Sequence, residues 1–153
     1  MRYIICIYIS LLAICISGCG PAQQKIPVRN YQAGEPIIEV ASAVINANDQ
    51  PWKQVSEGVR RKVYFNDRLT LVYLEIVGGD KRPMSPPHYH HHDQIGYVLE
   101  GKAIVYLGDH TKQINPGGAY IVTSNIPHAL KPLTDKLVLI EMFTPTREDF
   151  RVK

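Results

Sequence analysis

Four of the chain's six histidines lie within five residues of one another, in a stretch that reads HYHHH from His88 onward. Because side chains on an extended strand alternate between two faces, His88, His90 and His92 are predicted to share one face with Gln94. A further histidine, His128, follows an Ile-Pro pair just beyond an apolar run. Imidazole nitrogens with one oxygen ligand suit Zn, Ni, Fe, Co or Mn. The pattern indicates a site for one divalent metal ion, and the alternative is a histidine-rich surface loop.

The elements that must hold these residues are predicted to be short strands. Runs rich in β-branched and aromatic residues, separated by Gly, Pro or Asn-Asp turns, cover residues 62–77, 95–109, 119–124 and 136–143. The apolar runs on either side of Gly101 are typical of a hairpin. The only segment that suits a helix is Ile37–Asp49, although its β-branched residues disfavour one. Short strands at regular spacing indicate an all-β sandwich or barrel.

The N-terminus is predicted to be an export signal. All three cysteines lie in the first nineteen residues, and the apolar run Ile4–Ile16 is broken only by Ser10. This run is shorter than the roughly 20 residues that a membrane-spanning helix needs. It ends in ISGCG, which resembles the bacterial lipobox, and that resemblance implies that Cys19 is lipidated and becomes the first residue of the mature chain. The alternatives are an ordinary cleaved signal and an uncleaved anchor.

These features divide the chain into three parts. Residues 1–18 are the expected lipoprotein signal peptide, 19–36 a proline-containing tether, and 37–153 one domain with a single core. The mature protein is therefore expected in the cell envelope, anchored through its lipid and facing the periplasm or the surface. The 17 basic and 14 acidic residues form no basic stripe, so no nucleic-acid partner is expected.

The spacing of the histidines resembles the cupin superfamily. The first cupin motif is His-X-His, three or four residues, Glu, six residues and Gly, and the second is Pro-X-Gly followed by a ligand His. The matching residues here are His88, His90, Gln94 and Gly101 for the first motif, and Pro116, Gly118 and His128 for the second. Starting the first motif at His90 instead would place the fourth ligand at Gly96, which has no side chain.

The cupin resemblance implies a fold and a set of ligands. The fold is an all-β, single-domain cupin, a double-stranded β-helix or jelly-roll barrel. The implied ligands of one divalent metal ion are His88, His90, Gln94 and His128. Gln94 replaces the usual Glu, so it adds neither charge nor a proton-transferring group. The metal would keep its full charge and act as a stronger Lewis acid, while another residue must serve as the base.

Within the cupins, the stretch from His88 to Gly101 is similar to the KdgF type, which has Gln at this position. The C-terminal EMFTPTREDF is similar to that group's closing segment. The resemblance implies that the protein linearises 4,5-unsaturated monouronates from pectin or alginate into open-chain keto acids, without a redox cofactor. Glu141 would be the general acid and base, Arg147 would bind the substrate carboxylate, and Phe143 would wall the pocket. The family usually has Asp at the position of Glu141.

Other interpretations of these residues stay open. Phe143 could be a core residue, Glu141 a satisfied buried acid, and Arg147 a solvated tail residue paired with Asp149. Rival functions are a metal-dependent cupin dioxygenase and a lipid-anchored cupin that binds or senses a small sugar acid without turnover. Monouronates are usually processed in the cytoplasm, so a lipid-anchored protein would need its substrate outside. The expected partners are a small anionic sugar, the membrane through the lipid and, from the resemblance, a second copy in a homodimer.

Overall fold

The chain forms strands over most of the part that the computed structural model describes, which is residues 29–30 and 43–150. Two single turns of 3-10 helix, η1 and η2, complete these segments. The elements are β1 (Arg29–Asn30), β2 (Ala43–Val44), β3 (Lys53–Ser56), β4 (Val59–Phe65), β5 (Thr70–Val77), η1 (Gly79–Lys81), β6 (Asp93–Glu100), β7 (Ala103–Leu107), β8 (His110–Ile114), β9 (Ala119–Val122), β10 (His128–Pro132), β11 (Lys136–Thr144) and η2 (Glu148–Phe150).

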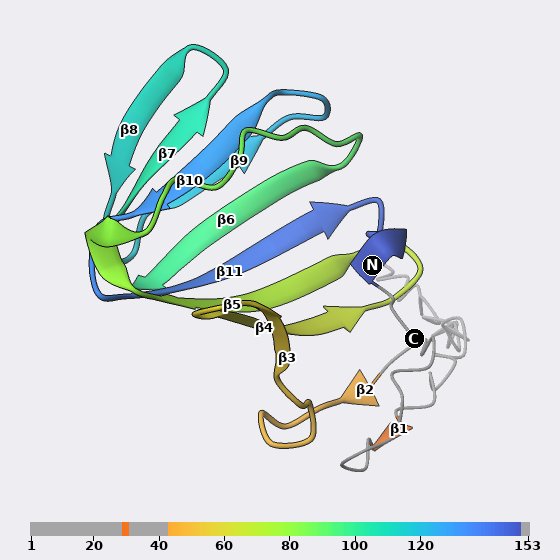
Figure 1. Ribbon diagram of the computed structural model, residues 1–153. Helices are drawn as coiled ribbons and strands as arrows, with labels where there is room; N and C mark the ends of the chain where they lie inside the picture. The colour runs from red at the N-terminus through yellow and green to blue at the C-terminus, as the bar shows by residue number, and fades with distance from the viewer. Residues whose placement is uncertain (1–28, 31–42, 151–153) are drawn as a thin grey trace, which may run out of the picture.

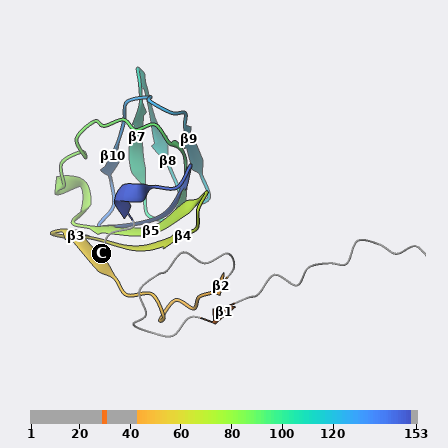
Figure 2. The ribbon, with the colours of Figure 1, turned by 90° about the vertical axis from the view of Figure 1, so that its right-hand side faces the viewer.

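Two sheets make the barrel. Six strands pair in the order β3-β4-β5-β11-β6-β9, and three pair in the order β10-β7-β8, with every neighbour antiparallel. Figure 1 shows the smaller sheet facing the larger one, and Figure 2 shows η2 lying across one end of the barrel. Strands β1 and β2 form a separate parallel pair. The structure confirms the predicted all-β jelly-roll barrel.

The core lies between the two sheets and follows the alternation of side chains along each strand. On β11, Leu137 and Leu139 are fully buried, and on β5 and β6 so are Val72 and Val98. Burying one such side chain contributes about 1.5–3 kcal/mol, so the inner faces of these strands hold the sheets together. Glu141 falls on the same inner face of β11, which places an acid on an otherwise apolar side.

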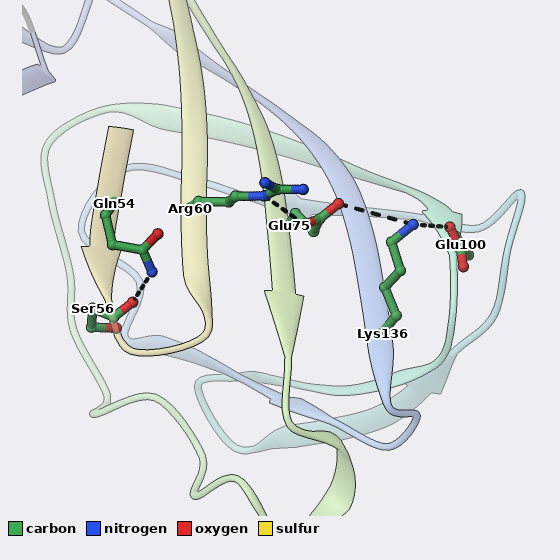
Figure 3. Close-up of polar contacts among 6 residues, drawn as sticks. All are labelled: Gln54, Ser56, Arg60, Glu75, Glu100 and Lys136. Atoms are coloured by element: carbon green, nitrogen blue, oxygen red, sulfur yellow. Dashed lines mark hydrogen bonds and ion pairs between the residues drawn. The ribbon is translucent and has the colours of Figure 1, made fainter. Parts of the chain in front are cut away.

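The outer face of the large sheet carries a row of ion pairs. Arg60 Nε lies 2.6 Å from Glu75 Oε1, and Lys136 Nζ lies 2.9 Å from Glu100 Oε2 and 3.9 Å from Glu75 Oε2. Figure 3 shows that this row runs across β4, β5, β11 and β6, roughly perpendicular to the strands. The row links four neighbouring strands through their solvent-facing side chains.

The predicted strands over 62–77 are confirmed as the antiparallel pair β4 and β5. Asn66 begins the turn between them, and its Oδ1 accepts hydrogen bonds from the backbone N–H groups of Arg68 and Leu69, each at 2.9 Å. An Asn side chain that binds backbone groups two and three residues ahead replaces the hydrogen bonds of a regular turn. This local chemistry explains why the Asn-Asp signal marked the turn correctly.

The predicted hairpin at Gly101 is wrong. The two apolar runs are β6 and β7, but β6 pairs with β9 and β11, whereas β7 pairs with β8 and β10. Gly101 has φ 82, and a Cβ there would lie 2.2 Å from the carbonyl oxygen of Lys136. A glycine is therefore required where the chain leaves the large sheet and crosses to the small one.

The helix considered over 37–49 is not formed in its described part, residues 43–49. These residues contain β2 and a turn, in which Asp49 Oδ2 accepts a hydrogen bond from the backbone N–H of Asn46 at 2.8 Å. Asn and Asp compete with helical hydrogen bonds in this way. The expected signal peptide with Cys19, and almost all of the tether, lie outside the described residues. Within the described ranges, no helix is long and apolar enough to cross a membrane.

Candidate functional site

Three histidines meet near one end of the barrel. His88 precedes β6 and pairs with His128, the first residue of β10, through two backbone hydrogen bonds of 3.0 and 2.9 Å. This isolated bridge brings their rings to a centroid separation of 4.3 Å, and the His90 ring lies 4.9 Å from that of His128. One ring nitrogen from each of the three lies within 4.8 Å of the others. These three histidines could hold a metal ion.

The rings of these histidines are held in one orientation by the backbone. In each ring, Nδ1 lies against a backbone carbonyl two residues away in the chain, at 3.2 Å for His88, 3.1 Å for His90 and 2.8 Å for His128. A carbonyl can only accept, so Nδ1 carries the proton and Nε2 keeps a lone pair. Burial lowers the pKa of His90 and of His128 and favours these neutral rings. Metal-binding histidines need this arrangement.

The side-chain oxygen of Gln94 lies beside these histidines, where it could act as a fourth ligand. Its Oε1 lies 3.1 Å from His90 Nε2, while its amide nitrogen donates a hydrogen bond of 2.9 Å to Glu141 Oε1. Two lone pairs, on Gln94 Oε1 and His90 Nε2, therefore face each other, and neither atom has a proton to donate. His128 Nε2 is buried and has no hydrogen-bond partner in the described part of the chain. A cation that accepts these lone pairs would satisfy all three atoms, so the residues present fit a divalent metal.

Tyr120 and Glu141 form a polar bridge across strand β6. Gly96 on β6 is the register partner of Tyr120 on β9 and of Glu141 on β11. The Tyr120 ring passes over Gly96, where a Cβ would lie 2.1 Å from the ring carbon Cζ. Its hydroxyl donates a hydrogen bond of 2.7 Å to Glu141 Oε1. The absence of a side chain at Gly96 lets the tyrosine hold the carboxyl in place.

The environment of Glu141 favours proton exchange. Burial raises the pKa of this carboxyl and outweighs the opposite effect of the Tyr120 hydrogen bond and of the nearby His88, Arg147 and Arg61. Burial also raises the pKa of Tyr120 well above its usual value, so the phenol stays a donor. A carboxyl whose pKa moves toward neutrality is better suited to give and take protons.

A cavity of about 510 Å³ opens onto this centre. Its size lies within the range of roughly 300–1,000 Å³ that is usual for small-molecule sites. The inner-face residues of β5 make an apolar wall, and the polar groups converge from both sheets: the residues that line it include His88, Gln94, Tyr120, His128, Glu141, Phe143, Arg147, Phe150 and Arg61. Such a cavity suits a small molecule with one apolar edge and several polar groups.

Phe143 and Arg147 both lie at the cavity. Phe143 is also the core residue considered above, and Arg147 is paired with Asp149 but is not solvated, because its side chain is only 14% exposed. Phe143 is only 3% exposed, packs with Val63 and Val72, and meets the His90 ring edge-on at 5.6 Å. The Arg147 fork binds Asp149, with Nε to Oδ1 at 2.9 Å and Nη2 to Oδ2 at 2.7 Å. This hydrogen bonding lowers the pKa of Asp149. Arg147 therefore lines the cavity while its guanidinium is already paired.

The predicted alternation through His92 is wrong. Strand β6 begins only at Asp93, and His91 and His92 form a bend. His92 is buried with its ring 3.8 Å from that of His91, and neither of its ring nitrogens has a hydrogen-bond partner among the described residues. The three histidines that meet are thus brought together by the bridge between His88 and His128, and not by one face of a strand.

Comparison with known proteins places this site in a family. The family model described as a cupin domain matches residues 76–143. The pectin degradation protein KdgF of Dickeya dadantii is 32% identical over 105 residues, which make up 67% of this chain and 93% of that protein. The chain is a cupin of the KdgF family. The match covers almost the whole relative, and the segment that the cupin model matches contains His88, His90, Gln94 and His128.

Solved structures agree with this KdgF assignment. KdgF from a Halomonas species is 29% identical, with a TM-score of 0.63 over 69% of this chain and 94% of that one. An RmlC-like cupin from Shewanella frigidimarina is 27% identical, with a TM-score of 0.63 over 69% and 93% of the two chains. An oxalate decarboxylase of Bacillus subtilis is 17% identical, with a TM-score of 0.56 over 63% and 28%, and shares the fold.

Sequence reasoning missed two cavity residues of this KdgF-family cupin, Tyr120 and Arg61. Tyr120 alternates with Val122 on a strand whose other residues face outward, so its inward direction was readable from the sequence. The sequence could not predict that Tyr120 contacts Glu141, because this contact depends on the register of three strands. Arg61 lies between the inward-facing Val59 and Val63. A charged residue at an inward position of a strand whose other inward residues are apolar could have indicated a site residue.

Proposed function

We propose that this chain catalyses the non-redox ring opening of 4,5-unsaturated monouronates, derived from pectin or alginate, to open-chain keto acids. Its membership of a family whose Dickeya dadantii member is named for pectin degradation supports an enzyme of this kind. The observation that carries the proposal is the position of the Glu141 carboxyl. It is hydrogen-bonded to Gln94 and lines the same cavity as the histidine centre.

We infer that one divalent metal ion is the cofactor, bound by His88, His90, His128 and Gln94. All four ligands are neutral, so they leave the charge of the ion uncompensated. When bound, such an ion supplies Lewis acidity to a substrate oxygen that gains negative charge. The ligand types allow Ni, Zn, Mn, Fe or Co.

Glu141 would move the protons. Its Oε1 accepts hydrogen bonds from Tyr120 and Gln94, which leaves Oε2 for the substrate. The carboxylate takes the proton of the anomeric hydroxyl while the bond between C1 and the ring oxygen breaks and C1 becomes an aldehyde. The electron pair stays on the ring oxygen and gives an enolate at C5. The carboxyl then returns the proton to C4, leaving a C5 ketone, so the reaction is an isomerisation.

Phe143 and Tyr120 would shape the space around the reacting ring. Phe143 is buried beside His90 and gives the sugar a flat apolar wall that excludes water from the enolate. Tyr120 holds the carboxyl at a fixed position, so that one oxygen faces the cavity. A carboxyl fixed by two donors needs little reorganisation when the substrate arrives.

The test uses the purified full chain in detergent, loaded in turn with Ni²⁺, Zn²⁺, Mn²⁺, Fe²⁺ or Co²⁺. Freshly prepared unsaturated galacturonate is added, and the loss of absorbance of the conjugated C4=C5 bond is compared with spontaneous opening. We expect faster loss with at least one metal, and no acceleration by the His90→Ala variant. If no metal accelerates the reaction although the protein binds metal tightly, the uronate assignment is wrong and only the metal site remains.

We further propose that Cys19 is lipidated and that the domain works in the cell envelope. This placement follows from the ISGCG pattern and requires that unsaturated uronates be released outside the cytoplasm. Labelling of expressing cells with a radioactive fatty acid should mark the wild-type chain and not Cys19→Ser. The homodimer stays a prediction, which the mass of the purified protein in solution would check.

A further inference from the structure

Arg61 is a charged residue on the apolar inner face of the large sheet. It lies on β4 between Val59 and Val63 and lines the same cavity as His88 and Glu141. Its neighbour Arg60 points to the outer face, where it is paired with Glu75. Because apolar residues stabilise an inner face without the cost of burying a charge, an inward arginine calls for a partner.

Among the described residues, the charges of Asp149 and Glu141 attract Arg61, but neither carboxylate forms an ion pair with it. No ion pair of Arg61 occurs in that part of the chain, and its Nε is buried without a hydrogen-bond partner. A buried donor left unsatisfied destabilises the folded state. Burial lowers the pKa of Arg61. An arginine nevertheless keeps its charge in proteins, so the guanidinium remains a cation that can bind an anion.

Arg147, the arginine expected to bind the substrate carboxylate, differs in this respect. Its two hydrogen bonds to Asp149 already form the fork-to-carboxylate pair that a substrate would need. Asp149 is thus bound by Arg147 and forms no ion pair with Arg61, whose own donors stay available.

Phe150 holds both arginines at the same end of the cavity. Its ring centroid lies 4.0 Å from Arg61 Cζ and 4.2 Å from Arg147 Cζ. An arginine that stacks on an aromatic ring keeps its N–H groups in the plane of the guanidinium, where a carboxylate can reach them. Phe150 belongs to η2, which lies across the end of the barrel in Figure 2. The ring thus fixes Arg61 at the mouth of the site without using its donors.

We propose that Arg61 binds the carboxylate of the ligand, and that Arg147 with Asp149 is a supporting pair that positions Phe150. The ligand class is a small carboxylic acid with hydroxyl groups, which rests on the proposed function. The same residue would exclude neutral sugars of equal size, because they leave the guanidinium unpaired inside the cavity.

Calorimetric binding of galacturonate to the Zn²⁺-saturated full chain tests this assignment. Galacturonate has no C4=C5 bond to react, and galactose is the matched neutral sugar. We expect Arg61→Gln to weaken galacturonate binding by about 10- to 100-fold, in line with the loss of a charged hydrogen-bond pair. The matched control is Arg60→Gln, which removes the adjacent arginine from the outer face and should leave the affinity unchanged. Arg61→Lys keeps the charge without the fork and should recover part of the affinity.

The outcomes separate this inference from the proposed function. Equal galacturonate affinity in Arg61→Gln and wild type would overturn the role of Arg61. If only Arg147→Gln lost affinity, carboxylate binding would be assigned to Arg147 instead. A weakened Arg61→Gln in a protein that does not accelerate uronate opening would support the carboxylate site and reject the enzyme. No binding of galacturonate by the wild-type chain would overturn the carboxylate site, whereas the ring-opening assay alone decides the enzyme. A circular dichroism melting curve checks that each variant is folded.

Discussion

The two faces of the large sheet carry polar networks that share strands β6 and β11 but differ in what they can do. On the outer face, Arg60, Glu75, Lys136 and Glu100 link β4, β5, β11 and β6 (Figure 3). On the inner face, hydrogen bonds link Tyr120 on β9, Glu141 on β11 and Gln94 on β6, and the Gln94 Oε1 lies 3.1 Å from the Nε2 of His90. Each network places a glutamate at its centre.

Exposure to solvent makes Glu75 and Glu141 differ in function. The partners of Glu75 have side chains that are 43% and 45% exposed, so water and salt screen their attraction. Glu141 accepts hydrogen bonds from neutral donors inside a cavity, where burial raises its pKa. Strand pairing decides which residues meet. The face of the sheet on which they meet decides whether a glutamate forms a surface ion pair or becomes a buried carboxyl suited to proton exchange.

The largest expected effect comes from removing the inner carboxylate. Glu141→Gln keeps the shape of the side chain and loses the proton-transferring group, so kcat for uronate opening should fall by about 10²–10⁴-fold. The matched outer-face variant, Glu75→Gln, should leave kcat unchanged and lower the free energy of unfolding by less than about 1 kcal/mol. Steady-state kinetics and urea unfolding of both variants measure the contrast. Equal effects on kcat would show that the two faces do not differ as described.

The second effect concerns the histidine centre. His128→Ala removes a buried imidazole whose Nε2 has no other partner among the described residues, and it should weaken Zn²⁺ binding by about 100-fold or more. His110→Ala, at the exposed start of β8, is the control and should bind Zn²⁺ as the wild type does. Calorimetric titration with Zn²⁺ gives both affinities. Unchanged binding by His128→Ala would place the metal elsewhere.

The third effect tests the contact across β6. Gly96→Ala would put a Cβ within 2.2 Å of two Tyr120 ring carbons, and overpacking of this kind costs about 1–3 kcal/mol. The displaced ring would also release the Glu141 carboxyl, so kcat should fall together with the unfolding temperature. Tyr120→Phe separates the two causes, because it keeps the ring and removes only the hydroxyl. A Gly96→Ala protein as stable and active as wild type would contradict the packing described.

The smallest effect is expected for the pair of Arg147 and Asp149, which joins a shielded side chain to an exposed one. The Arg147 side chain is 14% exposed and that of Asp149 is 57% exposed. The Arg147 hydrogen bonds lower the pKa of Asp149 in the folded protein, so the pair stabilises the fold at neutral pH. This contribution is lost as the pH falls through the lowered pKa. Asp149→Asn should therefore cost less than about 1 kcal/mol at pH 7, and at a second pH below the lowered pKa of Asp149 the difference from wild type should vanish. Urea unfolding at both pH values measures it.

Sequence reasoning succeeded where a residue's direction depends on its own strand. The alternation of Leu137, Leu139 and Glu141 placed the acid on the inner face, and the Asn66 turn placed β4 against β5. It failed at Gly101, because a hairpin and a crossing between sheets begin with the same local turn, and distant partners decide between them. The contact of Tyr120 with Glu141 likewise depends on tertiary pairing, whereas the local pair of Arg147 and Asp149 was among the alternatives that the sequence left open.

The proposed metal ligands come from both sheets, since His128 begins β10 of the small sheet and Gln94 belongs to β6 of the large one. A cation bound at this centre would act as a removable cross-link that exists only when the two sheets are assembled. Free metal at one hundred times its Kd would add about 2.7 kcal/mol to the free energy of unfolding. Heating the protein with and without a chelator should reveal this as a lower unfolding temperature for the stripped form. The concentration of free metal around the protein would then govern how long the barrel stays folded.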